Sequence, residues 1–304
     1  SAGRAIFTFL IVGSLLALSQ ESVFAQSQTA PVEGMRNNTP QVHALTNARI
    51  VTVPGQTISQ GTIIIRDGVI EAVGDNVRIP ADAHVWDYTG LTVYAGLIET
   101  YSQVGLPGPE KRGTPPGSPS NAPPAQEQRG VAHWNASVHP QDGAVDQYAV
   151  DDKALKALRG LGFTVALVAP HRGIFTGSSV LVSLGGGAPH DNILQDQVAQ
   201  HIRYARNSNR TDPGSLMGVI ALIRQTFLDT EWYEKAHEAV MANPTQNLPE
   251  ENEALEALRP ALRGQQPVMM SVTDDQTFLR ADKIAKEFGL KTWIHGSGQE
   301  YRML

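Results

Sequence analysis

Residues 93–103 read Val93-Tyr94-Ala95-Gly96-Leu97-Ile98-Glu99-Thr100-Tyr101-Ser102-Gln103, an apolar strand pattern that runs into a polar edge. Successive side chains of a strand point to opposite faces, so Tyr101 and Gln103 share one face. The stretch follows a segment rich in hairpin signals and precedes a region in which strand and helix patterns alternate. It therefore predicts the first strand of an α/β domain, with polar side chains gathered at the end of that strand.

Upstream of this stretch, residues 43–94 predict a small β module. Strand patterns cover residues 44–53, 61–74, 84–87 and 91–94. Within the second of these, Asp67-Gly68 separates two apolar runs and is a strong signal for a two-residue hairpin, because such a turn needs positive φ. We therefore expect a hairpin centred on this dipeptide.

Downstream, strand and helix patterns alternate from residue 150 onward. Strands are expected over 163–169, 267–272 and 291–295. Helices are expected over 152–159 with an aspartate cap, 191–205, 215–241, 250–263, and from a capping box of Thr273 and Gln276 to residue 288. This alternation with buried strands points to a parallel α/β sheet.

Two segments contain too little apolar surface to pack. Residues 26–42 are polar and rich in turn formers, which predicts a linker. Residues 106–130 are rich in Pro, Gly and Ser. The second segment is either a solvated insertion or a lid over the site, since long loops in compact domains are often functional.

Composition and the amino terminus bound the function class. The chain has 304 residues, 41% of them hydrophobic, a formal net charge of −6 and no cysteine. The acidic balance and the lack of a basic cluster argue against a nucleic-acid partner. Without cysteine, the chain has neither a thiolate metal ligand nor a cysteine nucleophile.

Residues 1–25 predict a cleaved signal peptide. Arg4 is followed by an apolar run over 5–18 and by small residues that end at Ala25. The apolar run is shorter than the ~20 residues that cross a bilayer, so we expect no permanent membrane span. The predicted location is periplasmic or secreted. The chain begins with Ser1 and stops at Leu304 inside a continuing strand–helix pattern, which suggests a fragment of a longer protein.

Three stretches resemble the amidohydrolase superfamily, specifically its imidazolonepropionase-like branch: residues 44–51 with 61–70, residues 96–99 and, more weakly, residues 267–302. This resemblance implies a zinc-dependent hydrolase that acts on C–N bonds other than peptide bonds in small molecules. It also implies an α/β fold, a partial TIM-type (β/α)8 barrel with a small N-terminal β-sandwich module. On this basis we expect the module over 43–94 and the barrel over 95–304, incomplete at its C-terminus.

The same resemblance defines candidate site residues at the ends of barrel strands. Family members carry two metal-binding histidines where this chain has Tyr101 and Gln103, and an aspartate where it has Glu99. Ser271 stands at a position that commonly holds a ligating histidine, whereas His295 matches a histidine of the next strand. His295 is thus the main candidate metal ligand among these five residues, whereas Glu99 either accepts hydrogen bonds or binds metal.

Four further residues lie outside the strand patterns. His171 and Arg172 follow the second strand of the α/β region, where side chains can face the mouth of a barrel. Arg172 would bind an anionic group through paired N–H donors, or form a surface ion pair. His133 and His139 are six residues apart, which matches no helical ligand pair, so they are either metal ligands or structural residues.

Two functions follow from these observations. The first is a hydrolase of C–N bonds with a reduced or relocated set of metal ligands. The second is a catalytically degenerate barrel that serves as a binding or assembly protein without metal, because Tyr101, Gln103 and Ser271 replace three ligands. Both predict a small-molecule substrate or ligand, and both are compatible with a homo-oligomer. No Gly-x-Ser-x-Gly elbow supports a serine hydrolase.

Overall fold

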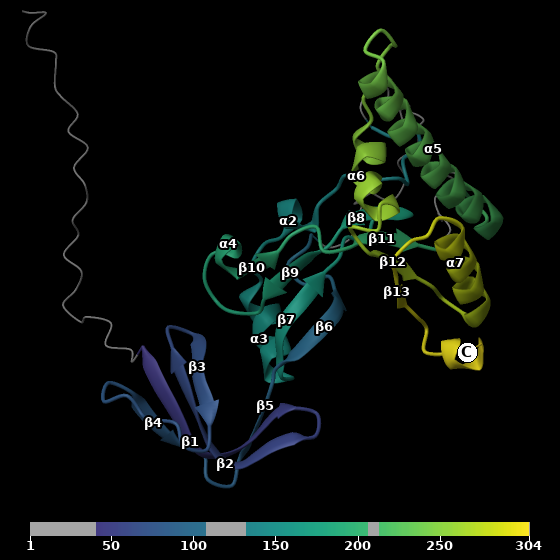
Figure 1. Cartoon of the computed structure of the whole chain (residues 1–304). Coiled ribbons are helices and arrows are strands. Elements are labelled where there is room, and N and C mark those ends of the chain that lie inside the picture. Colours follow the sequence, from purple (N-terminus) through teal and green to yellow (C-terminus); the bar gives the residue numbers. More distant parts are fainter. Residues whose placement is uncertain (1–40, 108–131, 206–212, 304) are drawn as a thin grey trace, which may run out of the picture. The chain divides into compact units, whose positions relative to one another are not determined.

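The computed structural model describes residues 41–107, 132–205 and 213–303. The chain divides into two compact units, Ser1–Ala95 and Gly96–Leu304 (Figure 1). The predicted signal peptide, nearly all of the predicted linker and most of the Pro/Gly/Ser-rich segment lie outside the described residues.

The first unit contains one sheet, built from β1 (Val42–Val53), β2 (Gln56–Arg66), β3 (Val69–Gly74), β4 (His84–Asp87) and β5 (Thr92–Tyr94). The strand order is β3-β2-β1-β4, and β5 also pairs with β1. β1, β2 and β3 are antiparallel neighbours, whereas β4 and β5 run parallel to β1. Small apolar clusters on β1 and β2, one around Ala44 and one around Ile50, stabilise this sheet.

The predicted hairpin at Asp67-Gly68 is confirmed. Arg66 pairs with Val69 across the turn. Asp67 and Gly68 both have positive φ, 50° and 78°. Two consecutive positive φ values match the right-handed twist of the flanking strands, and Asp-Gly is a residue pair that tolerates them.

The second unit contains two four-stranded sheets. One has the order β10-β9-β7-β6, from β6 (Leu97–Ser102), β7 (Phe163–Val168), β9 (Val180–Ser183) and β10 (Ile193–Gln195). β6 and β7 are parallel, as the sequence predicts for neighbouring barrel strands. The short helices α2 (Ala144–Gln147) and α4 (Pro189–Asn192) belong to this part, and α3 (Asp152–Gly160) packs on it through Leu155. Asp151 caps α3 by accepting from the backbone N–H groups of Lys153 and Ala154, as predicted.

The other sheet has the order β13-β12-β11-β8, from β8 (Phe175–Ser178), β11 (Gln200–Arg203), β12 (Val268–Ser271) and β13 (Thr292–His295). β11, β12 and β13 are parallel neighbours. Three helices, α5 (Leu216–Ala242), α6 (Glu253–Leu262) and α7 (Asp275–Glu287), also belong to this part (Figure 1). They contribute buried side chains to its core. A 3-10 turn, η1 (Glu300–Met303), follows β13.

The core of this second part is aromatic at its centre. Phe227 of α5 is fully buried and packs against Phe175 of β8 and Phe288, which follows α7, with ring centroids 5.6 and 5.1 Å apart. Ile202 and Met270, from neighbouring strands, are buried in the same cluster. One face of the sheet is therefore packed against helices, and the alternate residues of the strands face away from them.

Two local expectations are wrong. The predicted helix over 191–205 is instead the end of α4, β10, a turn in which Gln197 has a φ of 46°, and β11. The segment forms strands because its backbone pairs with β9 on one side and with β8 and β12 on the other, which outweighs its weak helical pattern. The N-cap of α7 is Asp274 rather than Thr273.

The mixed α/β class is confirmed, but the described strands of the second unit form two open sheets and no closed barrel. Among the described residues, no helix has both the length and the apolar composition that crossing a bilayer requires.

Candidate functional site

Three parallel strands carry polar side chains to the same face of their sheet. In register, Arg203, Ser271 and His295 lie beside one another at the carboxyl-terminal ends of β11, β12 and β13. His201 lies two residues before Arg203 and so faces the same side. Ile202, between them, faces the helix-packed core. The face opposite the helices therefore holds a polar surface at the strand ends.

Tyr101 of β6 joins this surface from the other sheet. Its ring stacks on the ring of His295, with centroids 4.0 Å apart and planes inclined by 15°. The Tyr101 ring also lies 6.0 Å from that of His201, tilted by 45°. Two residues that the sequence singled out, Tyr101 and His295, thus come together with a histidine that it missed.

His201 is the buried member of this group. It is 2% exposed, and neither ring nitrogen has a hydrogen-bond partner among the described residues. Burial, assisted by the neighbouring His295, lowers the pKa of His201 to about 4. Its imidazole is therefore neutral near pH 7 and presents one donor and one acceptor nitrogen.

The other candidate residues on these strands are less closely associated with the group of Tyr101, His201 and His295. The Glu99 carboxylate accepts from the backbone N–H of Tyr101 at 3.3 Å, so it is turned toward its own strand. Gln103 is exposed beyond the end of β6. Ser271 is half-buried between Arg203 and His295, and its carbonyl oxygen accepts from the backbone N–H of Tyr204 at 3.1 Å.

His171 and Arg172 belong to a separate small cavity of about 200 Å³, which Asp142 and Thr176 also line. Arg172 is exposed, whereas His171 is half-buried. The Arg203 guanidinium donates to the carbonyl oxygen of His171, which ties this loop to the end of β11. The structure thus brings the backbone carbonyl of His171 into contact with Arg203.

His133 and His139 each bond within their own loop. Nδ1 of His133 accepts from the backbone N–H of Asn135 at 3.0 Å, and burial lowers the pKa of His133. Nε2 of His139 donates to the carbonyl of Ala136 at 2.7 Å. These bonds support the structural interpretation of His139, whereas Nε2 of His133 is buried and has no hydrogen-bond partner among the described residues.

The residues present do not fit the zinc site that the family resemblance implies. A catalytic zinc ion takes about three protein ligands and keeps one position open for water. In the ranges that the structure describes, no three histidine, cysteine or carboxylate residues are grouped so that they could hold an ion. Within the described ranges, the rings of His201 and His295 contact Tyr101, and the Glu99 carboxylate accepts from the backbone N–H of Tyr101.

His201 and Arg203 are not among the residues that the sequence predicts for the site, because both fall in the segment 191–205 with its helical pattern. The one signal for them is local: both are polar and flank the apolar Ile202, which is the alternation of a half-buried strand. An alternation over three residues is too short to predict a strand within a segment whose longer pattern has the period of a helix.

Comparison with solved structures shows what this fold resembles. An amidohydrolase from Thermotoga maritima MSB8 matches with a TM-score of 0.68 and 20% identity, over 86% of this chain and 66% of that one. This likeness shows a shared fold, and the fold of an amidohydrolase implies a TIM-barrel-like arrangement. This chain spans slightly less than two thirds of the length of that protein.

A second structure, a prolidase complexed with N-methylphosphonate-L-proline, covers 85% of this chain and 61% of its own, at 14% identity. Its TM-score of 0.35 is too low to support an argument. No protein-family model matches the chain, and no curated protein matches it.

Proposed function

We propose that this chain is part of a hydrolase of the amidohydrolase superfamily, of the imidazolonepropionase-like branch, that acts on C–N bonds other than peptide bonds in a small molecule. The observation that carries the proposal is the convergence of Tyr101, His201 and His295 at strand ends of an amidohydrolase-type fold. In barrel enzymes, substrates bind at the carboxyl-terminal ends of the strands.

The chemistry of these side chains supports an uncharged, planar substrate group. The neutral His201 offers one donor and one acceptor, which complement the carbonyl and N–H of an amide. The stacked rings of Tyr101 and His295 give a flat aromatic surface for a cyclic substrate. Arg203 and Ser271 add donors on the same face. In this proposal, these residues bind and orient the substrate. A metal-dependent step would need metal ligands that the described residues do not bring together.

A second candidate is a binding or assembly protein that uses the same face without metal. It is favoured by Tyr101, Gln103 and Ser271, which stand where the resemblance places metal-binding histidines. Loss of several ligands removes most metal affinity, because each ligand contributes directly to coordination.

One experiment distinguishes the two candidates. The metal content of the complete purified protein is measured together with turnover of cyclic amides and N-acyl amino acids, with and without a chelator. Turnover that a chelator abolishes, with stoichiometric zinc, would exclude the metal-free binding protein. A folded, metal-free protein that binds these amides without turning them over would exclude the hydrolase.

A variant tests whether the described face is the site. His201→Asn is expected to weaken binding or turnover about tenfold, because it removes a hydrogen bond that the buried His201 ring would make to the substrate. His190→Asn is the control, since His190 belongs to α4 and its side chain is 81% exposed. Equal activity of the two variants would place the site elsewhere.

A further inference from the structure

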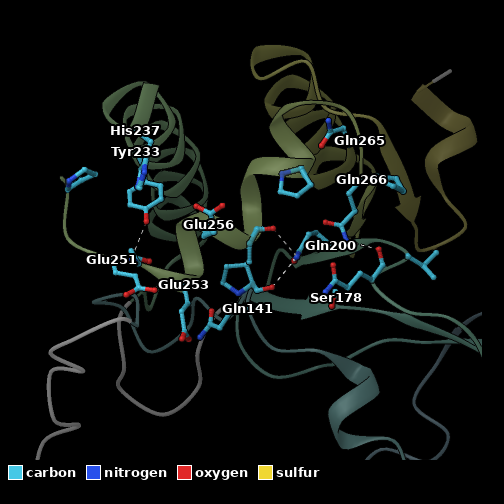
Figure 2. A pocket seen from close by; sticks show the side chains of 18 of the residues that line it. Gln141, Ser178, Gln200, Tyr233, His237, Glu251, Glu253, Glu256, Gln265 and Gln266 are labelled. Carbon is cyan, nitrogen blue, oxygen red and sulfur yellow. Dashed lines mark hydrogen bonds between the residues drawn. The ribbon is translucent and has the colours of Figure 1, made fainter. Parts of the chain in front are cut away.

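A second, larger cavity lies where β11 and β12 begin, at the opposite ends of these strands from Arg203 and Ser271. Its volume is about 1020 Å³. The second half of α5, the α5–α6 connection, the start of α6 and the segments that precede β11 and β12 all contribute to its walls (Figure 2). None of the candidate residues of the strand-end site lines it.

A buried side chain at this cavity has an unused acceptor. Gln200 is 3% exposed, and its Nε2 donates to the carbonyl oxygens of Pro140 at 3.0 Å and Ala257 at 3.4 Å (Figure 2). Two carbonyl partners require the nitrogen on that side, so the amide orientation is determined. Its Oε1 then has no partner among the described residues, and neither has Oε1 of Gln141, which also lines the cavity. Buried acceptors without a donor are costly, so both point to a ligand that donates hydrogen bonds.

The charges around the cavity have one sign. Glu251, Glu253 and Glu256 line it, and none of its described lining residues is Lys or Arg. Both carboxylate oxygens of Glu256 bond to Arg259, at 2.7 Å each. Glu251 and Glu253 form no ion pair within the described part of the chain, so their charges are available to a cation.

The remaining walls suit a hydrocarbon stem. The Tyr233 ring, Leu248 and several prolines line the same space. An aromatic face attracts an ammonium group in addition to packing against methylene groups. A metal ion is a poorer fit, since the described residues include no three metal-binding side chains grouped together.

We propose that this cavity binds an aliphatic diamine, whose ammonium groups donate to the Gln200 and Gln141 oxygens and pair with Glu251 and Glu253. Two ammonium groups on one short stem satisfy separate acceptors and leave the methylene groups against the apolar wall. This site is independent of the proposed hydrolase activity, because it shares no residue with the strand-end face.

The test is a calorimetric titration of the complete protein with 1,4-diaminobutane. We expect binding at a single site that weakens as salt screens the charges. The double variant Glu251→Gln, Glu253→Gln is expected to weaken binding about tenfold, because charge-assisted hydrogen bonds become neutral ones. Glu250→Gln is the matched control: Glu250 is exposed, adjacent in sequence, and absent from the cavity wall.

Three results would overturn the proposal. These are no binding of the diamine by the folded protein, equal binding of the neutral 1,4-butanediol, or equal weakening by Glu250→Gln and the double variant. If the double variant does not fold, Gln141→Ala replaces it, and its binding must weaken while its circular dichroism stays that of the parent. Turnover of amides is measured in parallel, so failure of this proposal and failure of the hydrolase proposal are seen separately.

Discussion

His201 combines burial with an unpaired ring at the centre of the strand-end face. A histidine with a free donor and a free acceptor, 2% exposed, costs stability unless a ligand uses those nitrogens. Buried titratable residues with shifted pKa values are common at functional sites, where they contribute to binding although they lower stability. The contacts of Tyr101 with both His201 and His295 show which side chains share that place.

The lowered pKa of His201 predicts acid sensitivity. An unfolded histidine titrates near 6.5, whereas folded His201 titrates at about 4. Between these values the unfolded chain binds a proton that the folded chain does not, so stability falls as pH falls through this window and levels off below it. The loss amounts to roughly 3 kcal/mol.

His201→Phe is expected to remove most of that loss. The free energy of unfolding is measured by urea at pH 7 and at about pH 4.5, and the difference between the two values is compared with that of the parent. His190→Gln, at an exposed position, serves as the control. An unchanged difference in His201→Phe would show that this residue is not the source of acid sensitivity.

At the scale of elements, the sequence predicts the features that depend on local signals, but it does not predict those that depend on long-range strand pairing. The cap of α3 is an aspartate, Asp151, as the sequence predicts, because a cap needs only its own first turn. Residues 191–205 depend on partners far along the chain: β11 pairs with β12, about 68 residues later in register. Their strands could not be read from a local period.

The cap of α7 is a testable case. The Asp274 carboxylate accepts from the backbone N–H of Thr277 at 2.7 Å and from its hydroxyl at 2.9 Å. The first of these bonds contributes most to holding the pKa of Asp274 below its usual range. Asp274→Ala is therefore expected to lower the free energy of unfolding by about 1 kcal/mol. Its contribution is present at neutral pH and is lost as pH falls through the lowered pKa.

Thr273→Ala is the matched control for this cap. Among the residues that the structure describes, the Thr273 hydroxyl donates only to Asp274, so its loss is expected to cost less than about 0.5 kcal/mol. The free energy of unfolding of both variants is measured by urea at neutral pH and compared with that of the parent. A larger effect at Thr273 than at Asp274 would restore the capping box that the sequence suggested.

At the scale of the whole molecule, α5 has one side in the buried core and another side exposed to solvent. Phe227 is fully buried between Phe175 and Phe288, whereas Trp232, five residues later on the same helix, is 62% exposed. Phe227→Ala is expected to cost about 3–5 kcal/mol, because it leaves a cavity in a closely packed core. Trp232→Ala is expected to change stability by about 0.5 kcal/mol or less, and similar losses in the two variants would contradict this core.

Features that depend on neighbouring residues follow from the amino-acid sequence. Asp67-Gly68 forms the predicted hairpin because only certain residues accept two positive φ values, and residues 97–102 form the predicted strand with polar residues at its end. Long-range packing, in contrast, brings Tyr101, His201 and His295 together and places Gln200, with its unpaired acceptor, at a cavity. These outcomes depend on the pairing and packing of segments about a hundred residues apart, and no local pattern records which segments will meet.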